Sequence, residues 1–282
     1  MRVRLFAELC CGSAAVTVRL LGGSSARPPV SYMGSKRGYA GAILDVLGLR
    51  AGAGADACLL ADPGPWSRVW SVLTLPDGCR EVAGHLRGWV GEDPRALWDR
   101  LRADKPLEGA TTDPRDVAAW LWVVGHGDFS KPPRLSRIYA APAGDSEGRW
   151  KASPPGWLAN RVKRAPRWPT TTIATDARVI PLPERLPDGC YVYIDPPYRA
   201  TTGYAHDLPR ADVLDLALRW SDAGAVVAVS EAEPLPLPGW HHVELTGERV
   251  GQKRTFSRQQ AEWLTLNRAP AVKLGGQGSL FR

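Results

Sequence analysis

The sequence contains few of the residues that hold small secreted domains together or bind structural zinc. Its five cysteines are an odd number and include no Cys-x-x-Cys spacing, so neither a disulfide framework nor a zinc site is expected, and a reducing cytoplasm is the predicted compartment. No stretch approaches the ~18 uninterrupted apolar residues of a membrane-spanning helix. The chain opens on a strand-like run instead of a signal peptide. We therefore expect a cytoplasmic protein without a metal site or a membrane anchor.

The chain is long enough, at 282 residues and 44% hydrophobic content, for one large or two modest domains with a buried core. Its formal charge of +7 favours an anionic partner. Residues 131–168 carry nine basic and two acidic residues, an excess that equals that of the whole chain. Tyr139, Trp150, Trp157 and Trp168 are interleaved with these charges. The composition suits phosphate contact with insertion of rings into a groove, although a solvated basic surface loop, or the Arg-rich composition of a GC-rich genome, would look alike.

The strongest pattern is a short apolar strand, residues 191–194, that runs into Asp195-Pro196-Pro197-Tyr198. Proline fixes φ and donates no hydrogen bond, so the strand is predicted to end at Asp195 and to be followed by a stiff loop. Open α/β sheets bind ligands at the carboxyl ends of their strands. Asp195 and the carbonyl of Pro196 can accept hydrogen bonds from a planar amine, and Tyr198 can stack on the ring that bears it.

These residues match the Asp-Pro-Pro-Tyr motif of the amino-methyltransferases, which use S-adenosylmethionine to methylate the exocyclic nitrogen of adenine or cytosine. A second segment, residues 31–37, resembles the aromatic-x-Gly-x-Lys signature of the DNA adenine-N6 methyltransferase family, with Tyr32, Gly34 and Lys36 in its three positions. In that family the segment precedes a helix, and a helix is predicted here at residues 39–47. The resemblance implies that all three residues lie beside the cofactor.

The first strand and turn of the chain resemble the family's acid-x-Phe-x-Gly-x-Gly cofactor motif. Glu8 and Gly12 are in register, Cys10 stands where the family has Phe, and Ala14 replaces the second Gly. We expect a strand at residues 3–7, a turn at 8–13 and a helix at 14–21, and Ala14 can serve if its φ is negative. The order of motifs is unusual, because Lys36 follows this turn. Either the elements meet in the same places despite their order, or one assignment is wrong.

The resemblance also implies roles for carboxylates that follow other predicted strands. Asp62, after a strand at residues 57–61, would hold the ribose of the cofactor, unless it caps the helix that begins near Trp66. Asp176, after a strand at residues 170–175, would lie beside the cofactor adenine. Asp195 and Pro196 would accept from the target amine, with Tyr198 and Tyr204 holding the flipped base. Further helices are expected at residues 80–90, 94–102, 114–124 and 209–223, and strands at 225–230, 243–246 and 261–266.

The implied fold is α/β: a Rossmann-like sheet of seven strands, mostly parallel, with an antiparallel C-terminal hairpin. Residues 1–80 and 169–282 would form the catalytic domain, and residues 81–168 an inserted, helical and loop-rich target-recognition region. The implied partner is double-stranded DNA. Candidate DNA contacts, besides Tyr204, are Arg134, Arg137, Lys151, Arg161, Lys163, Arg164, Lys253 and Arg254.

The sequence is also compatible with other functions. Cytosine N4 methylation would use the same chemistry, a ribosomal RNA methyltransferase can carry the same tetrapeptide, and a catalytically silent DNA-binding protein could keep the fold. Cytosine C5 methylation is not favoured, because neither Cys79 nor Cys190 follows a proline. The sequence also leaves open a bacterial or a phage origin, and a cognate restriction nuclease.

Overall fold

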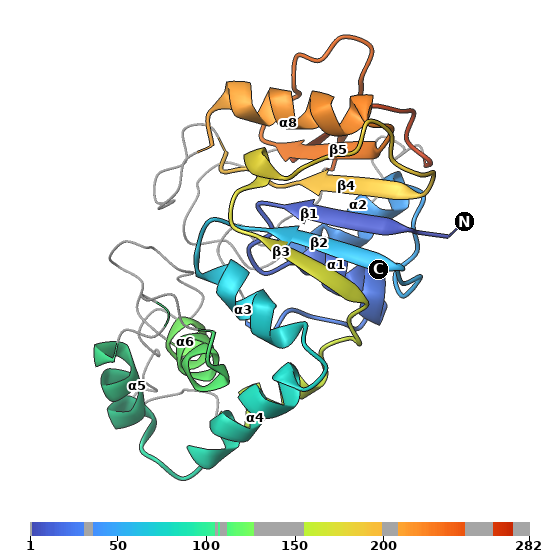
Figure 1. The fold of residues 1–282 in the computed structure, drawn as a ribbon. Coiled ribbons are helices and arrows are strands. Elements are labelled where there is room, and N and C mark those ends of the chain that lie inside the picture. The colour runs from blue at the N-terminus through green and yellow to red at the C-terminus, as the bar shows by residue number, and fades with distance from the viewer. Residues whose placement is uncertain are drawn as a thin grey trace.

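The structure is a computed structural model that describes residues 2–30, 36–104, 107, 112–126, 155–198, 208–245 and 262–272. Strands and helices alternate through most of these residues (Figure 1). The strands are β1 (Leu5–Leu9), β2 (Ala57–Ala61), β3 (Thr170–Ala174), β4 (Cys190–Ile194), β5 (Val226–Glu231), β6 (His241–Glu244) and β7 (Trp263–Leu266). The helices are α1 (Ala15–Gly22), η1 (Lys36–Gly38), α2 (Ala40–Val46), α3 (Pro65–Leu73), α4 (Gly78–Gly88), α5 (Pro94–Ala103), α6 (Pro114–His126), α7 (Pro155–Lys163), η3 (Ala177–Val179) and α8 (Arg210–Asp222).

Seven strands in the described residues form one sheet, in the order β3-β2-β1-β4-β5-β7-β6. Strands β1 to β5 are parallel, and β7 runs antiparallel between β5 and β6. The chain moves to one side of β1 through β2 and β3, and to the other side through β4 and β5. Such a reversal leaves a crevice at the carboxyl ends of the two central strands. The predicted α/β class, with a mostly parallel sheet and an antiparallel C-terminal pair, is confirmed, and the strand order is compatible with a Rossmann-like fold.

Helices cover both faces of the central strands (Figure 1). Successive side chains of a strand point to opposite faces: Phe6, Tyr191 and Tyr193 pack against α1 and α2, whereas Val192 and Ile194 pack against α8. β4 is therefore buried along its whole length, as expected for a strand in a parallel sheet. None of the helices in the described part of the chain has the length and apolar character needed to cross a bilayer.

Helices α3 to α7 lie beyond the β3 edge of the sheet and share a core rich in tryptophan (Figure 1). The ring of Trp66 lies 5.8 Å from that of Trp70 and 5.1 Å from that of Trp120, centroid to centroid. Trp168 packs on Trp70 at 5.1 Å. Side chains from α1 and β2 belong to the same cluster. This core therefore includes residues on both sides of the predicted boundary at residues 80 and 81 between the catalytic domain and the recognition region.

Two local predictions need correction. Residues 155–163, predicted as part of a loop-rich stretch, form helix α7; Pro155 is its first residue, a position where proline is tolerated because no N–H is required there. Strand β1 reaches Leu9, so Glu8 lies inside the strand and not in the turn after it. Residues 127–154, which include most of the predicted basic stretch, lie outside the described residues.

Candidate active site

Asp195 follows the last residue of β4 at the point where the strand order reverses. Its backbone N–H donates to the carbonyl of Leu9, the last residue of β1, at 3.0 Å. Pro196 and Pro197 have no N–H to extend the ladder, which explains why β4 ends here as predicted. The side chain of Asp195 is 15% exposed, and Pro196 is buried. A carboxylate is thereby fixed in the crevice between β1 and β4.

The structure brings Lys36 to this carboxylate, although 158 residues separate the two in the sequence. The Nζ atom of Lys36 lies 2.7 Å from Oδ1 of Asp195 and 4.4 Å from the centre of the Tyr198 ring. The Lys36 side chain is only 6% exposed. Tyr32 and Gly34, predicted beside it, lie outside the described residues. The last residue of one predicted motif therefore contacts both the first and the last residues of the other.

Glu262 is a member of this cluster that we did not predict. It is fully buried, and its Oε1 lies 3.6 Å from Nζ of Lys36. The hydroxyl of Tyr198 donates a hydrogen bond to the same oxygen. Glu262 directly precedes β7, and its carbonyl accepts from the N–H of Leu245. A lone acid next to the apolar run of β7 was the available signal, but only the pairing of β7 with β5 brings it to the end of β4.

The surroundings of Asp195 raise the pKa of its carboxyl above the ordinary value. Burial raises its pKa to about 6; the charge of Lys36 opposes this effect, and that of Glu262 adds to it. At the end of β5, burial also raises the pKa of Glu231, against the opposing charge of Arg210, whose Nη1 lies 2.7 Å from the carboxylate. Carboxylates thus gather here around two cations, which limits the cost of burying them.

A buried polar pair lies beside the cluster on the central strands. The hydroxyl of Tyr193 and Oγ of Ser230 are 2.6 Å apart, and neither side chain is exposed. Burial, with Asp195 and Glu262 nearby, raises the pKa of Tyr193 well above its usual range. Tyr193 therefore stays neutral and acts as a hydrogen-bonding group only.

The turn after β1 is built on left-handed backbone. Cys10, Gly12 and Ala14 have φ of 56°, 46° and 47°. The condition under which Ala14 could replace glycine, a negative φ, is not met. The turn holds Cys10 and Ala14 in the left-handed conformation that glycine adopts most readily, at a cost of about 1 kcal/mol each. Close approach of backbone to a ligand is one setting in which such turns occur.

Glu8 acts from inside β1 on the helix that follows this turn. One carboxylate oxygen accepts from the backbone N–H and the hydroxyl of Thr17, at 2.7 and 2.5 Å, and the other from the N–H of Val16 at 3.5 Å. Burial nevertheless raises the pKa of Glu8 to about 7, with these bonds opposing it. In this structure Glu8 satisfies the first turn of α1.

Asp62 links the turns that follow β1 and β2. Its carboxylate accepts from the N–H of Gly12 at 2.9 Å and from that of Gly64 at 2.8 Å. The N-cap of α3 is Gly64, without a side-chain cap, so Asp62 does not cap that helix. Cys10 lies among these acids: burial raises the pKa of its thiol, and Asp62, Asp195 and Asp176 add to the effect. The predicted cofactor residues of the two turns are therefore close to Asp195.

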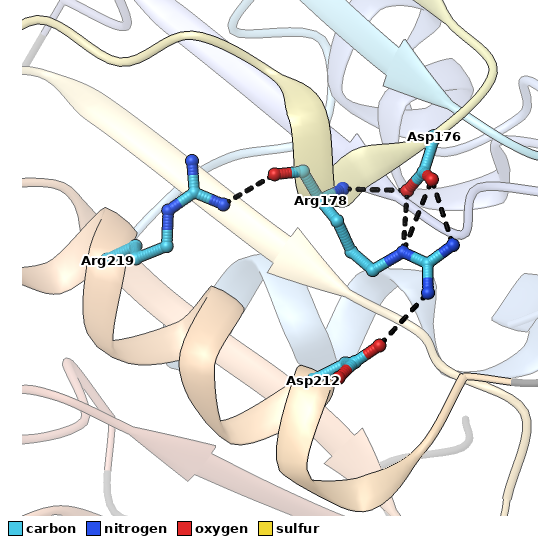
Figure 2. A network of polar contacts seen from close by, with 4 residues as sticks. All are labelled: Asp176, Arg178, Asp212 and Arg219. Atoms are coloured by element: carbon cyan, nitrogen blue, oxygen red, sulfur yellow. Dashed lines mark hydrogen bonds and ion pairs between the residues drawn. The ribbon is translucent and has the colours of Figure 1, made fainter.

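Asp176 caps η3 and is bound by Arg178 (Figure 2). Its Oδ1 accepts from the backbone N–H of Arg178 at 2.9 Å, and the guanidinium of Arg178 contacts both oxygens at 2.9 to 3.2 Å. These bonds lower the pKa of Asp176. Arg178 also reaches Asp212 of α8 at 3.1 Å, and Arg219 donates to the carbonyl of Arg178 at 2.7 Å. A ligand of Asp176 would share it with Arg178.

The described candidates for DNA contact do not gather at this site. Arg161 and Lys163 lie on α7, and Arg164 follows it. The chain then enters the amino end of β3, and Pro166 packs against Gly22 at the end of α1. Lys163 and Arg164 therefore lie near the amino ends of the parallel strands, whereas Asp195 lies at their carboxyl ends. Arg161 stacks on Trp157 at 4.7 Å and donates to the carbonyl of Pro28 at 2.6 Å. The remaining candidates lie outside the described residues: Arg134, Arg137, Lys151, Tyr204, Lys253 and Arg254.

A scan against models of protein families found no match to this chain, and a search of curated proteins found none either. Within the described residues, no three His, Cys, Asp or Glu side chains are arranged to hold a metal ion.

Proposed function

We propose that the protein is a DNA methyltransferase that transfers a methyl group from S-adenosylmethionine to the N6 amino group of adenine in double-stranded DNA. The observation that carries the proposal is the 2.7 Å contact between Lys36 and Asp195. These residues come from two separate motifs of the family, and the position of Lys36 was in doubt because its motif follows the glycine turn of β1. Their contact supports the reading in which the motifs keep their places.

The residues around the β1 turn fit the cofactor that the resemblance implies. Left-handed backbone at Gly12 and its neighbours permits close approach of a ligand. Asp62 lies beside this turn with carboxylate oxygens that can each accept more than one hydrogen bond, as ribose hydroxyls require. The acids around Cys10 also favour a cation, and the cofactor supplies a methyl group on a positively charged sulfur.

Asp195 and Pro196 would act on the acceptor amine. The lone pair of an exocyclic amine is delocalised into the base, so the amine is a poor nucleophile. Hydrogen bonds from N6 to Oδ2 of Asp195 and to the Pro196 carbonyl favour a pyramidal nitrogen with its lone pair directed at the methyl donor. Lys36 holds Oδ1 of Asp195, which leaves the other oxygen oriented for the amine.

Tyr198 would hold the base in the site. A base inside a duplex cannot reach Asp195, so it must be flipped out at a cost of a few kcal/mol, partly offset by stacking. The ring of Tyr198 has the ammonium of Lys36 over one face. Its hydroxyl is bound to Glu262, so the position and the tilt of the ring are both fixed.

The test is methyl transfer by the purified protein to duplex DNA, followed by nucleoside analysis of the product. We expect N6-methyladenine from wild type, none from Asp195→Ala, and unchanged S-adenosylmethionine binding by calorimetry in that variant. Asp215→Ala, which removes an exposed carboxylate from α8, is the matched control and should retain activity. Full activity in Asp195→Ala contradicts the mechanism.

The same assay separates the alternatives. N4-methylcytosine in the product would identify the cytosine enzyme, and transfer to ribosomal RNA but not to DNA would identify an RNA methyltransferase. A wild type that neither transfers methyl groups nor binds S-adenosylmethionine would be a DNA-binding protein on this fold.

A further inference from the structure

Glu262 is buried at a position where a carboxylate is expensive. Its side chain is fully inaccessible to solvent, and moving an ionised carboxyl out of water costs several kcal/mol unless charges and hydrogen bonds compensate. An apolar residue in front of β7 would avoid this cost. A carboxylate at this position is therefore expected to interact with side chains that compensate for its burial.

Two of the partners of Glu262 belong to the proposed catalytic cluster. Oε1 of Glu262 lies 3.6 Å from Nζ of Lys36 and accepts the hydrogen bond of the Tyr198 hydroxyl. The same ammonium lies 2.7 Å from Asp195 and 4.4 Å from the Tyr198 ring. One carboxylate oxygen thus touches the residue that orients Asp195 and the residue that would stack on the base.

Glu262 is well placed to keep these two side chains fixed. Its carbonyl is bonded to the N–H of Leu245, and the next residue, Trp263, pairs with Glu231 of β5 and Glu244 of β6. The backbone from which the carboxylate extends is therefore part of the sheet. Lys36 lies in the 3₁₀ helix η1 and Tyr198 on irregular backbone, so neither is held by the hydrogen bonds of the sheet.

We propose that Glu262 is a positioning residue of the methyl-transfer site: it holds the ammonium of Lys36 against Asp195 and fixes the ring of Tyr198 through its hydroxyl. This inference rests on the proposed function and adds to it a residue that lies outside both sequence motifs. Glu262 touches neither the methyl donor nor the reacting nitrogen. It acts through Lys36 and Tyr198, so its loss should slow the transfer step more than it weakens cofactor binding.

The pH dependence of the transfer step gives a readout that a purely structural role would not move. The charge of Glu262 raises the pKa of Asp195, so removing it should lower that pKa and move the acid limb of the kcat profile to lower pH. The groups that face or electrostatically influence Asp195 are Lys36 of η1, Glu8 of β1, Cys10, Tyr193 of β4, Tyr198, Glu231 of β5 and Glu262. Of these groups, Glu262→Gln alters residue 262 alone.

The experiment compares Glu262→Gln and Tyr198→Phe with wild type in steady-state methylation of duplex DNA. Glu262→Gln keeps the size and an acceptor but removes the charge; we expect kcat to fall about tenfold to a hundredfold, KM for S-adenosylmethionine to stay within about twofold, and the acid limb to shift downwards. Tyr198→Phe keeps the ring and removes only the hydroxyl; we expect kcat to fall about threefold to tenfold, the equivalent of one hydrogen bond. Glu244→Gln, an exposed carboxylate on β6, is the matched control and should match wild type.

The outcomes separate this inference from the proposed function. If wild type methylates adenine and both variants keep its kcat and its pH profile, the inference is overturned and the proposed function stands. If wild type methylates no nucleic acid, the proposed function fails, and the role of Glu262 fails with it. If Glu262→Gln does not fold, Tyr198→Phe decides: an unchanged kcat overturns the inference, and the expected loss supports it.

Discussion

The buried carboxyl of Glu8 should make the protein less stable as pH rises from about 5 to about 8.5. Its pKa is about 7 in the folded chain, against the ordinary value of 4.5. A raised pKa means that the native state binds the proton more tightly than the unfolded state does, so the stabilisation is complete below pH 4.5 and is lost as pH rises through 7. The slope approaches about −1.4 kcal/mol per pH unit between the two pKa values and falls to zero above the folded one.

The clean perturbation is Glu8→Gln, because glutamine has nearly the same shape and does not titrate. It replaces one of two oxygens that accept hydrogen bonds from Val16 and Thr17, which adds a cost that is independent of pH. The free energy of unfolding of wild type, relative to the variant, should therefore fall by about 2.5 kcal/mol between about pH 5 and about pH 8.5.

Urea unfolding measures this change, followed through the fluorescence of the 12 tryptophans. Titration of groups that do not interact with Glu8 cancels when wild type and variant are compared at each pH. Glu184→Gln, an exposed carboxylate on the crossover between β3 and β4, is the matched control and should differ from wild type by a constant amount. A constant difference for Glu8→Gln as well would refute the reasoning, because the carboxyl would then titrate alike in the folded and unfolded chains.

Two further predictions concern the cluster and the turn. Lys36→Met removes the cation that lowers the pKa of Asp195, so the acid limb of kcat should move from about pH 6 towards neutral. Activity at pH 7 should then fall more than activity at pH 9. A pH profile that keeps its acid limb in place would contradict the pairing of Lys36 with Asp195. Ala14→Gly should raise the free energy of unfolding by about 1 kcal/mol, because Ala14 has a φ of 47°. The control, Ala15→Gly in α1, should lower it by up to about 1 kcal/mol. If both substitutions changed the free energy of unfolding in the same direction, the left-handed turn would be contradicted.

Local sequence was sufficient for most strands and for the acids that follow them. Asp62, Asp176 and Asp195 each follow a predicted strand, because short apolar or β-branched runs and the breakers after them act within a few residues. Helix α7 was not predicted: residues 155–163 were included in a loop-rich region, because proline usually interrupts helices, whereas Pro155 begins this one. In that case only the tertiary contacts of Leu158 and Val162 with the tryptophan-rich core show which reading applies.

Contacts between distant segments could not be read from the sequence alone. The resemblance implied that Lys36 lies beside the cofactor, but its pairing with Asp195 was not predicted, and neither was the part played by Glu262. Glu262 reaches Lys36 because β7 inserts antiparallel beside β5, a long-range pairing that no local pattern specifies. Likewise Arg178 could not be matched to Asp212 before helix α8 was placed across the sheet (Figure 2).

The order of the motifs along the chain has a simple topological explanation. β1 and β2 are parallel neighbours, so α1 must return the chain from the carboxyl edge of the sheet to the amino edge. Here the connection between β1 and β2 runs along the sheet a second time. After α1 the chain comes back to the carboxyl edge, where Lys36 lies beside Asp195, and α2 leads it to the amino edge again. The end of α2 packs near the end of β7, where Ala271 donates to the carbonyl of Val46. This second passage therefore lies over β4, β5 and β7, and it delivers Lys36 to Asp195 and Glu262. A segment that preceded β1 could reach the same place, because the sheet, and not the order of the chain, fixes where the cluster forms.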